Sequence, residues 1–345
     1  MDSLTHLAMG AVIGEAVLGR EQGKRAWLWG AIIAAFPDID VTFKYLFTPA
    51  GGILFHRGMT HSILICTLLV FAFGYLLNRL YGNDKSYRGW HKLVAWCLFS
   101  HIFIDIFNSY SVTLFWPLNI RVVFDSMGIF DGMFIFPFFA AFISFLFLRK
   151  KVWVRKRMAI IAICMATLYL GFTSINKLRV ESKVRNELKA RGERIGKVRA
   201  APLPLTNFMW MVMAEEKDGS GFWQTSVTTL NKRNLTYSFI AKNSGLSDEF
   251  ANDKEFKRIK RFSRGFYAIT TDSLGNKYFC DLRFPNFDFF GDSPPINAVV
   301  KYELKVDEKG NLELDWTAPI RKISWDRLKT YFLQIRGKYE YQLGK

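Results

Sequence analysis

The stretch "FHRGMTHS" (55–62) places two histidines and an arginine directly ahead of "ILICTLLVFAFGYLL" (63–77), a run that contains no charge. Apolar runs near 20 residues long are typical of helices that cross a bilayer. Ionisable side chains at the mouth of such a helix are costly unless they have partners, and they usually mark a functional site. The stretch therefore predicts a membrane helix that begins beside a polar site.

Other apolar segments surround this one in the first half of the chain. Three further runs approach bilayer length, and they cover residues 92–107, 129–148 and 158–175. Two shorter helical segments, 4–19 and 26–36, precede them and are joined by the polar turn "REQGKR". We expect these two to form a helical hairpin in which small residues allow close packing, namely Gly10, Gly14 and Gly19.

The basic residues follow the loops between these segments. The net charge is +17, and thirteen Lys and Arg lie in the loops 20–25, 79–92 and 149–157, against three in the loops 37–60 and 109–128. This bias predicts that the basic loops are cytoplasmic and that the other two loops face outward across a bacterial inner membrane. The charge is thereby explained without nucleic acid, for which no binding motif is present. The four cysteines show no pairing pattern, which argues against a disulfide framework or a zinc ribbon.

The second half of the chain has a different character. Residues 176–199 are charged and helix-prone, and alternating residues after them predict β-hairpins over 265–284 and 301–316, followed by a helix over 324–335. The predicted fold is an α-helical integral membrane domain of five or six helices (1–175), a juxtamembrane helix or linker (176–199) and a small β-rich, α+β soluble domain (200–345). If all six helices span, the soluble domain is extracytoplasmic, although nine Lys and Arg in 176–199 oppose this.

All five histidines lie within the first 101 residues. In the expected topology, seven imidazole and carboxylate side chains meet at the outer ends of four helices: His6, Asp38, Asp40, His56, His61, His101 and Asp105. The last two share one helix face because they are four residues apart. His91 falls on the cytoplasmic side and is excluded.

Imidazole and carboxylate groups are ligands for Zn²⁺, Mn²⁺ or Fe²⁺. Four histidines and three aspartates exceed what one tetrahedral zinc ion needs, so either two ions bind, or one binds and a remaining acid such as Asp38 or Asp40 acts as a base. Other interpretations stay open: a turn after Pro37 that accounts for both acids, a His–Asp pair without metal, a proton relay, or Arg57 as an interfacial anchor.

The motifs "THLAMG" (5–10), "PDID" (37–40), "HRGMTHS" (56–62) and "HIFIDIFNSYSVTLFWP" (101–117) together resemble a family of LexA-regulated inner-membrane proteins regarded as metal-dependent hydrolases. The resemblance covers about residues 1–150. It implies a bacterial membrane protein with the seven residues above in a metal-dependent site, Arg57 as a ligand for an anionic group, and Asp131 as a further acid at the start of the next helix. Asn108 and Ser111 depart from the family pattern, so the loop after Asp105 is expected to differ.

These inferences predict a membrane-bound hydrolase whose metal-activated water attacks an ester or phosphoester of a lipid or lipid-linked substrate, with Tyr110 and Trp116 at the entrance. The favoured ion is zinc, with one or two ions bound. Two alternatives are a non-enzymatic scaffold whose metal is structural, and an ion or proton carrier. The oligomeric state is left open.

Overall fold

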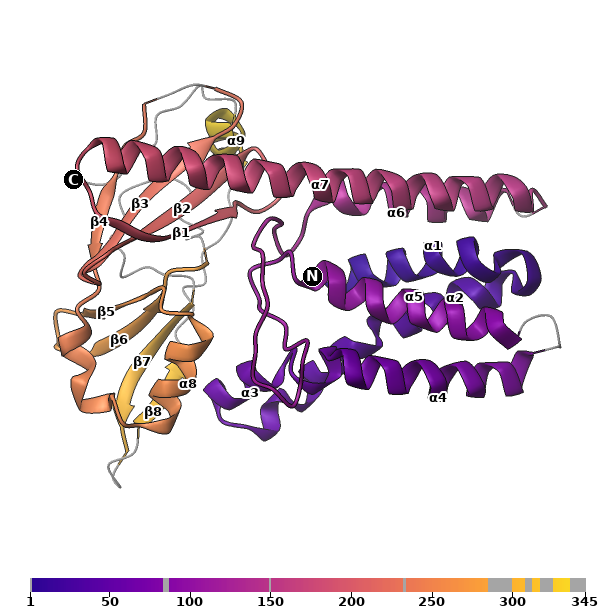
Figure 1. The fold of residues 1–345 in the computed structure, drawn as a ribbon, viewed down its shortest axis with the longest axis horizontal. Coiled ribbons are helices and arrows are strands. Elements are labelled where there is room, and N and C mark those ends of the chain that lie inside the picture. Colours follow the sequence, from indigo (N-terminus) through magenta and orange to yellow (C-terminus); the bar gives the residue numbers. More distant parts are fainter. Residues whose placement is uncertain are drawn as a thin grey trace. The chain divides into compact units, whose positions relative to one another are not determined.

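The computed structural model describes residues 2–82, 87–148, 150–231, 234–284, 300–307, 312–316 and 325–335. The chain divides into two compact units. The helical unit comprises Met1–Lys44, Phe55–Ser174 and Pro204–Thr206, and the β unit comprises Tyr45–Leu54, Ile175–Leu203 and Asn207–Lys345. Figure 1 shows the elements of both. The predicted fold class, a helical region followed by a β-rich α+β domain, is confirmed.

The helical unit is built from the expected apolar segments (Figure 1). In chain order its elements are α1 (Ser3–Gln22), α2 (Lys24–Ala35), the 3₁₀ helices η1 (Phe36–Leu46) and η2 (Met59–His61), α4 (Ile63–Tyr81), α5 (Tyr87–Asp105), α6 (Gly132–Phe147) and the first part of α7 (Val152–Ala190). Buried apolar side chains from α1, α2, α4, α5, α6 and α7 form one continuous core.

The hairpin of α1 and α2 depends on glycine at its contact face. A Cβ atom on Gly10 would lie 2.2 Å from the Gly30 carbonyl oxygen, and one on Gly14 would lie 2.0 Å from that of Ala26. The two backbones therefore touch, as predicted for Gly10 and Gly14. Gly19 serves a different purpose, because a Cβ there would collide with the buried Glu15 carboxylate, which pairs with Arg155.

Replacing Gly14 by Ala should force α1 and α2 apart and destabilise the protein by about 1–3 kcal/mol, the usual cost of overpacking a close contact. The matched control is Gly171→Ala on α7, where a Cβ meets nothing within 4 Å. It should be neutral or stabilise by about 0.5–1 kcal/mol. Denaturant unfolding of the detergent-solubilised chain compares the two; equal effects would contradict the contact argument.

Three stretches of the described chain are long and apolar enough to cross a membrane: Lys24–Phe43, Ile63–Tyr81 and Val152–Ala190. Gly132–Phe147 is apolar but shorter. The segment at α5 was also expected to approach a membrane span, but it is less apolar because it carries Arg88, His91, Lys92 and His101. These helices support membrane localisation.

The β unit contains two antiparallel four-stranded meanders (Figure 1). The first has β1 (Ile195–Pro202), β2 (Met209–Glu216), β3 (Gly221–Thr228) and β4 (Ser238–Ala241), and the second has β5 (Tyr267–Thr271), β6 (Lys277–Asp281), β7 (Val300–Val306) and β8 (Leu312–Trp316). The 3₁₀ helix η3 (Ser244–Phe250) and helix α8 (Lys254–Phe262) connect them, and α9 (Trp325–Ile335) follows. Both predicted hairpins and the terminal helix are present.

Alternation along β2 gives the first sheet two buried faces. Trp210, Val212 and Ala214 pack with Val184 of α7, whereas Met209, Met211 and Met213 join a core that includes Ile335 of α9. The last apolar segment and the charged segment after it form one continuous helix, α7, because no proline or helix-ending turn separates them.

The β unit also includes a segment from the first part of the chain. Residues 45–54, with most of α3 (Pro49–Phe55), belong to it. Ala50 lies in the core with Phe256 of α8 and Tyr302 of β7. Arg258 Nη1 donates a hydrogen bond of 3.3 Å to Thr48 Oγ1. The β unit is therefore assembled from separate stretches of sequence.

Candidate metal centre

The site residues come from four helix ends of the helical unit. His6 lies in the first turn of α1, Asp38 and Asp40 lie in η1 just after α2, His61 ends η2, and His101 and Asp105 occupy the last turns of α5. Pro37 follows the end of α2 at Ala35, so the PDID acids lie in a tight 3₁₀ turn. Ser62 caps α4 through a bond from Ile65 N to its hydroxyl, which fixes His61 immediately outside that helix.

Four side chains converge on one point. Ligand atoms of Asp38, His61, His101 and Asp105 all lie within 4.8 Å of one another. His61 Nε2 is 3.1 Å from His101 Nε2, 3.4 Å from Asp38 Oδ1 and 3.4 Å from Asp105 Oδ2. His101 Nε2 is 3.7 Å and 3.5 Å from the same two oxygens. Tetrahedral zinc ligands about 2.0–2.1 Å from the ion lie about 3.3–3.4 Å from one another, so the donor set has the size of a zinc site.

Both imidazoles present a lone pair to the centre. His101 Nδ1 lies 2.6 Å from the Ala34 carbonyl oxygen, which can only accept, so the proton is on Nδ1. Thr60 Oγ1 donates to Asp40 Oδ2, and His61 Nδ1, 2.9 Å from Thr60 Oγ1, then donates to that hydroxyl. When both rings are neutral, two unprotonated Nε2 atoms therefore face each other 3.1 Å apart, an arrangement that a cation between them would stabilise.

The centre is buried and rich in negative charge. His61, His101 and Asp105 are fully buried, and Asp38 is 9% exposed. Burial opposes charge on the His61 ring, but the carboxylates of Asp105, Asp38 and Asp40 outweigh it and raise the pKa of His61 to about 10. The same surroundings that attract a proton would favour a divalent ion, because buried carboxylates require a counter-charge.

Asp40 and His56 form the support behind His61. Asp40 Oδ1 lies 2.6 Å from His56 Nδ1, and its Oδ2 accepts from the backbone N–H of Arg57 and from Thr60. Asp40 Oδ2 is also 3.5 Å from His61 Nδ1. Hydrogen bonds of this kind orient a metal-binding imidazole and raise its basicity. Asp40 and His56 are thus close to the four-residue centre without being part of it.

Arg57 reaches the centre from an unusual backbone position. Its φ is +61°, in the left-handed region, which costs a non-glycine residue about 1–2 kcal/mol. Its Nη1 donates to Asn108 Oδ1 at 2.7 Å and to the Tyr110 carbonyl oxygen at 3.3 Å, and its Nε lies 3.5 Å from Asp105 Oδ2. Asn108 also donates to Asp105 Oδ1 at 3.1 Å. Asn108, which departs from the family pattern, therefore helps to position both Arg57 and Asp105 in the site.

His6 lies against the centre with its ring stacked on that of His101, at a centroid separation of 3.8 Å. His6 Nε2 is 3.3 Å from Asp105 Oδ1. Neither ring nitrogen makes a hydrogen bond to any part of the chain that the structure describes, although the ring is completely buried. A buried imidazole without a hydrogen bond fits a further metal ligand, because such polar groups otherwise carry a desolvation cost.

The family described as YdjM inner membrane protein matches residues 1–180. The chain belongs to the YdjM inner membrane protein family. This is the LexA-regulated inner-membrane family that the sequence motifs resemble.

A relative of the YdjM-family chain occurs in Bacillus subtilis (strain 168), where it is described as the uncharacterized protein YfhP. The two are 32% identical over 132 residues, which cover 34% of this chain and 38% of the Bacillus protein. The match therefore spans well under half of either protein. No solved structure matches the chain.

Two residues considered from the sequence lie elsewhere in the YdjM-family structure. Asp131 is the N-cap of α6, where it accepts bonds from the N–H groups of Met133 and Phe134 and from the Tyr169 hydroxyl. It is not one of the four converging residues. His91, which the sequence excluded, lies against Phe71 of α4. Thr60, within the quoted motif, and the Ala34 carbonyl are site groups that the sequence analysis missed.

Removing one converging ligand should abolish stable metal binding. His61→Ala and Asp105→Asn are expected to lower the metal content of the detergent-purified protein about tenfold or more, because each leaves an incomplete donor set. Inductively coupled plasma mass spectrometry of protein prepared with zinc measures this. His91→Ala is the histidine control and should bind as much metal as the unaltered chain; equal losses in all three would point to unfolding.

Asp40→Asn tests the support behind His61. It leaves all four converging side chains in place but weakens the acceptor for Thr60 and His56, so zinc affinity should fall about 10–100-fold. Competition with a chromophoric chelator gives the affinity. Unchanged affinity would show that Asp40 does not orient His61.

Proposed function

We propose that this protein is a metal-dependent hydrolase that cleaves an ester or phosphoester of a membrane lipid or lipid-linked molecule. The observation that carries the proposal is the convergence of two imidazole nitrogens and two carboxylate oxygens at zinc-like separations. The guanidinium group of Arg57 approaches one of these carboxylates, with its Nε 3.5 Å from Asp105 Oδ2. This combination of donors and a fixed cation is typical of sites that hydrolyse charged esters.

Asp38, His61, His101 and Asp105 would hold the ion, with His6 as an additional ligand. Zinc suits this mixture of nitrogen and oxygen donors, and Mn²⁺ or Fe²⁺ are alternatives. His6 faces Oδ1 of Asp105, whereas His61 and His101 face Oδ2. Asp105 would therefore serve as a ligand whether one ion or two bind. When bound, such an ion lowers the pKa of a water ligand and polarises the group under attack.

The two acids of the PDID motif receive different roles in this proposal. Asp40 already accepts from Arg57 N and Thr60 and lies 2.6 Å from His56 Nδ1, so it has little capacity left for the reaction. Asp38 Oδ1 accepts no hydrogen bond from any residue in the described ranges, and Asp38 is the most exposed of the four. Because Oδ1 would hold the ion, we assign the second carboxylate oxygen of Asp38, rather than Asp40, as the group that would accept a proton from water.

Arg57 would orient the anionic oxygen of the substrate. Asn108 holds its Nη1, and the guanidinium carbon lies 5.3 Å from the centre of the Tyr110 ring, which limits the motion of the side chain. A guanidinium fork binds phosphate or carboxylate oxygens in two-point contacts that a lysine cannot reproduce. Tyr110 remains the residue proposed at the entrance, with Trp116 in the following loop.

A lipid substrate is favoured by the surroundings of the site. Ile39, Val41 and Phe43, which flank the two acids in η1, are exposed apolar side chains. Exposed apolar residues beside a polar site suit the boundary between head groups and hydrocarbon. The distribution of basic loops favours the outer face of the inner membrane, with several helices crossing it.

Hydrolysis by purified protein tests the proposal. We expect zinc- or manganese-loaded protein in nanodiscs to release 4-nitrophenol from 4-nitrophenyl carboxylic or phosphoric esters. His61→Ala and Asp105→Ala should lower kcat/KM at least about 10³-fold, and Arg57→Lys about tenfold or more, mainly through KM, because the fork binds the anion.

His91→Ala should retain full activity in the same assay. Activity that survives in both ligand variants would reject the proposed site. Tight metal binding without turnover on any ester would favour the structural-metal scaffold instead.

A further inference from the structure

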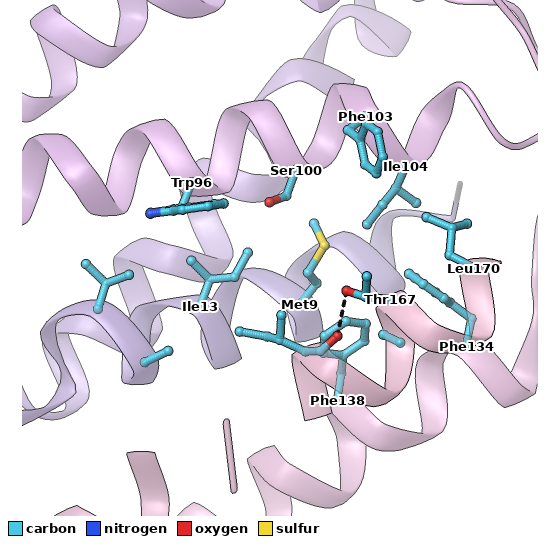
Figure 2. A pocket seen from close by; sticks show the side chains of 14 residues that line it. Met9, Ile13, Trp96, Ser100, Phe103, Ile104, Phe134, Phe138, Thr167 and Leu170 are labelled. Atoms are coloured by element: carbon cyan, nitrogen blue, oxygen red, sulfur yellow. Dashed lines mark hydrogen bonds between the residues drawn. The ribbon is translucent and has the colours of Figure 1, made fainter. Parts of the chain in front are cut away.

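The helical unit contains an apolar cavity of about 430 Å³ between α1, α5, α6 and α7 (Figure 2). Its size lies within the range of about 300–1,000 Å³ that is usual for small-molecule sites. Hydroxyl groups in the lining come from Ser100 and Thr167, and Thr167 donates its proton to the Ile163 carbonyl at 2.8 Å. The cavity therefore offers an occupant almost no polar partner.

The cavity has a closed floor and an open apolar side. Met9, Phe134 and Ala166 on its floor are buried, whereas Trp96 is 62% and Phe103 53% exposed at its edge. Exposed large apolar side chains on a membrane-associated helical unit mark surface that contacts lipid, and we infer that Trp96 and Phe103 do so. An occupant that enters past them comes from the bilayer and must itself be apolar, because no water is available there to fill the space.

The cavity adjoins the candidate metal centre along two helices. On α1, Met9 lies one turn after His6, whose ring stacks on His101. On α5, Ser100 and Ile104 directly precede His101 and Asp105 in the sequence and therefore lie about 100° from them around the helix. From Ile104 back to Trp96 the helix rises about 12 Å, so the cavity leads away from the centre over that distance.

We propose that this cavity holds the hydrocarbon chain of the substrate while the ester group lies at the metal centre. The inference rests on the proposed function and specifies its substrate as a single-chain or multi-chain amphiphile, cleaved close to its head group. The apolar lining extends from Ile104 to Ile13, Ala16 and Val17, and this length would then set a preference for long alkyl chains over short ones.

Matched substrates of different chain length test the inference. Wild-type protein should hydrolyse hexadecyl 4-nitrophenyl phosphate, or 4-nitrophenyl palmitate, with a kcat/KM about tenfold or more above that for the ethyl or acetyl compound, because chain burial contributes binding free energy. Ala16→Phe, which fills the cavity, should lower this long-to-short ratio about tenfold. Thr167→Phe, at the open edge, is a second filling variant in case the first does not fold.

Ala140→Phe is the control, because Ala140 lies on α6 with its side chain exposed and does not line the cavity. It should keep the wild-type ratio. An unchanged ratio in both filling variants, or no chain-length preference in the wild type, would overturn the inference and leave the proposed hydrolysis intact.

A binding measurement separates the two proposals. Hexadecyl phosphate carrying a terminal diazirine should, on illumination, label cavity residues of Asp105→Asn protein in nanodiscs. Hexadecyl phosphate should compete with this labelling, whereas ethyl phosphate should not, and Ala16→Phe should reduce it. This pattern without hydrolysis of any ester would support the chain site and reject the enzyme. Labelling spread evenly over the apolar faces of α2 and α4, which contribute no residue to the cavity, and without competition, would reject the chain site.

Discussion

The helical unit depends on charge compensation at one buried point. Asp38 and Asp105 come within reach of two imidazoles at a depth where water is largely excluded. Buried carboxylates require a positive counter-charge. Arg57 supplies one positive charge, because its Nε lies 3.5 Å from Asp105 Oδ2. A divalent ion would supply the remainder. The close backbone contact at Gly10 and Gly14 serves this point, because it brings the start of α1 and the end of α2 to the same end of the bundle.

The surrounding hydrogen bonds limit what each group can do. His101 is fixed by the Ala34 carbonyl and His61 by Thr60, so both rings present the same nitrogen to the centre. Asp40 is engaged in holding this arrangement, whereas Asp38 retains an oxygen without a hydrogen bond among the described residues. The left-handed backbone at Arg57 is consistent with this picture, since strain is usually retained where geometry matters for function.

Much of this arrangement could be anticipated from sequence, because apolar periodicity and loop charges dictate which helix ends meet. The roles of individual side chains could not. Asp38 and Asp40 look equivalent in "PDID", but the tight turn of η1 directs one to the centre and the other to His56 and Thr60. His56 and His61 also look equivalent in the sequence, but His61 is one of the four converging residues, whereas His56 lies beside Asp40. Asp131 resembled a site acid because it precedes an apolar helix, and that position is also the usual place for an N-cap. Small differences in backbone dihedral angles decide which of two nearby side chains enters the site, and residue spacing in the sequence does not encode these angles.

The placement of residues 45–54 affects how the protein can be divided. This segment lies between Asp40 and His56 in the sequence, yet Ala50 completes the core around α8 and β7. A fragment that begins at residue 176 would therefore expose an apolar hollow where Ala50 belongs, and a fragment that ends there would leave the same segment without its apolar neighbours. The two units are therefore interleaved along the sequence. Loss or exchange of one unit during evolution would require a compensating change in the other.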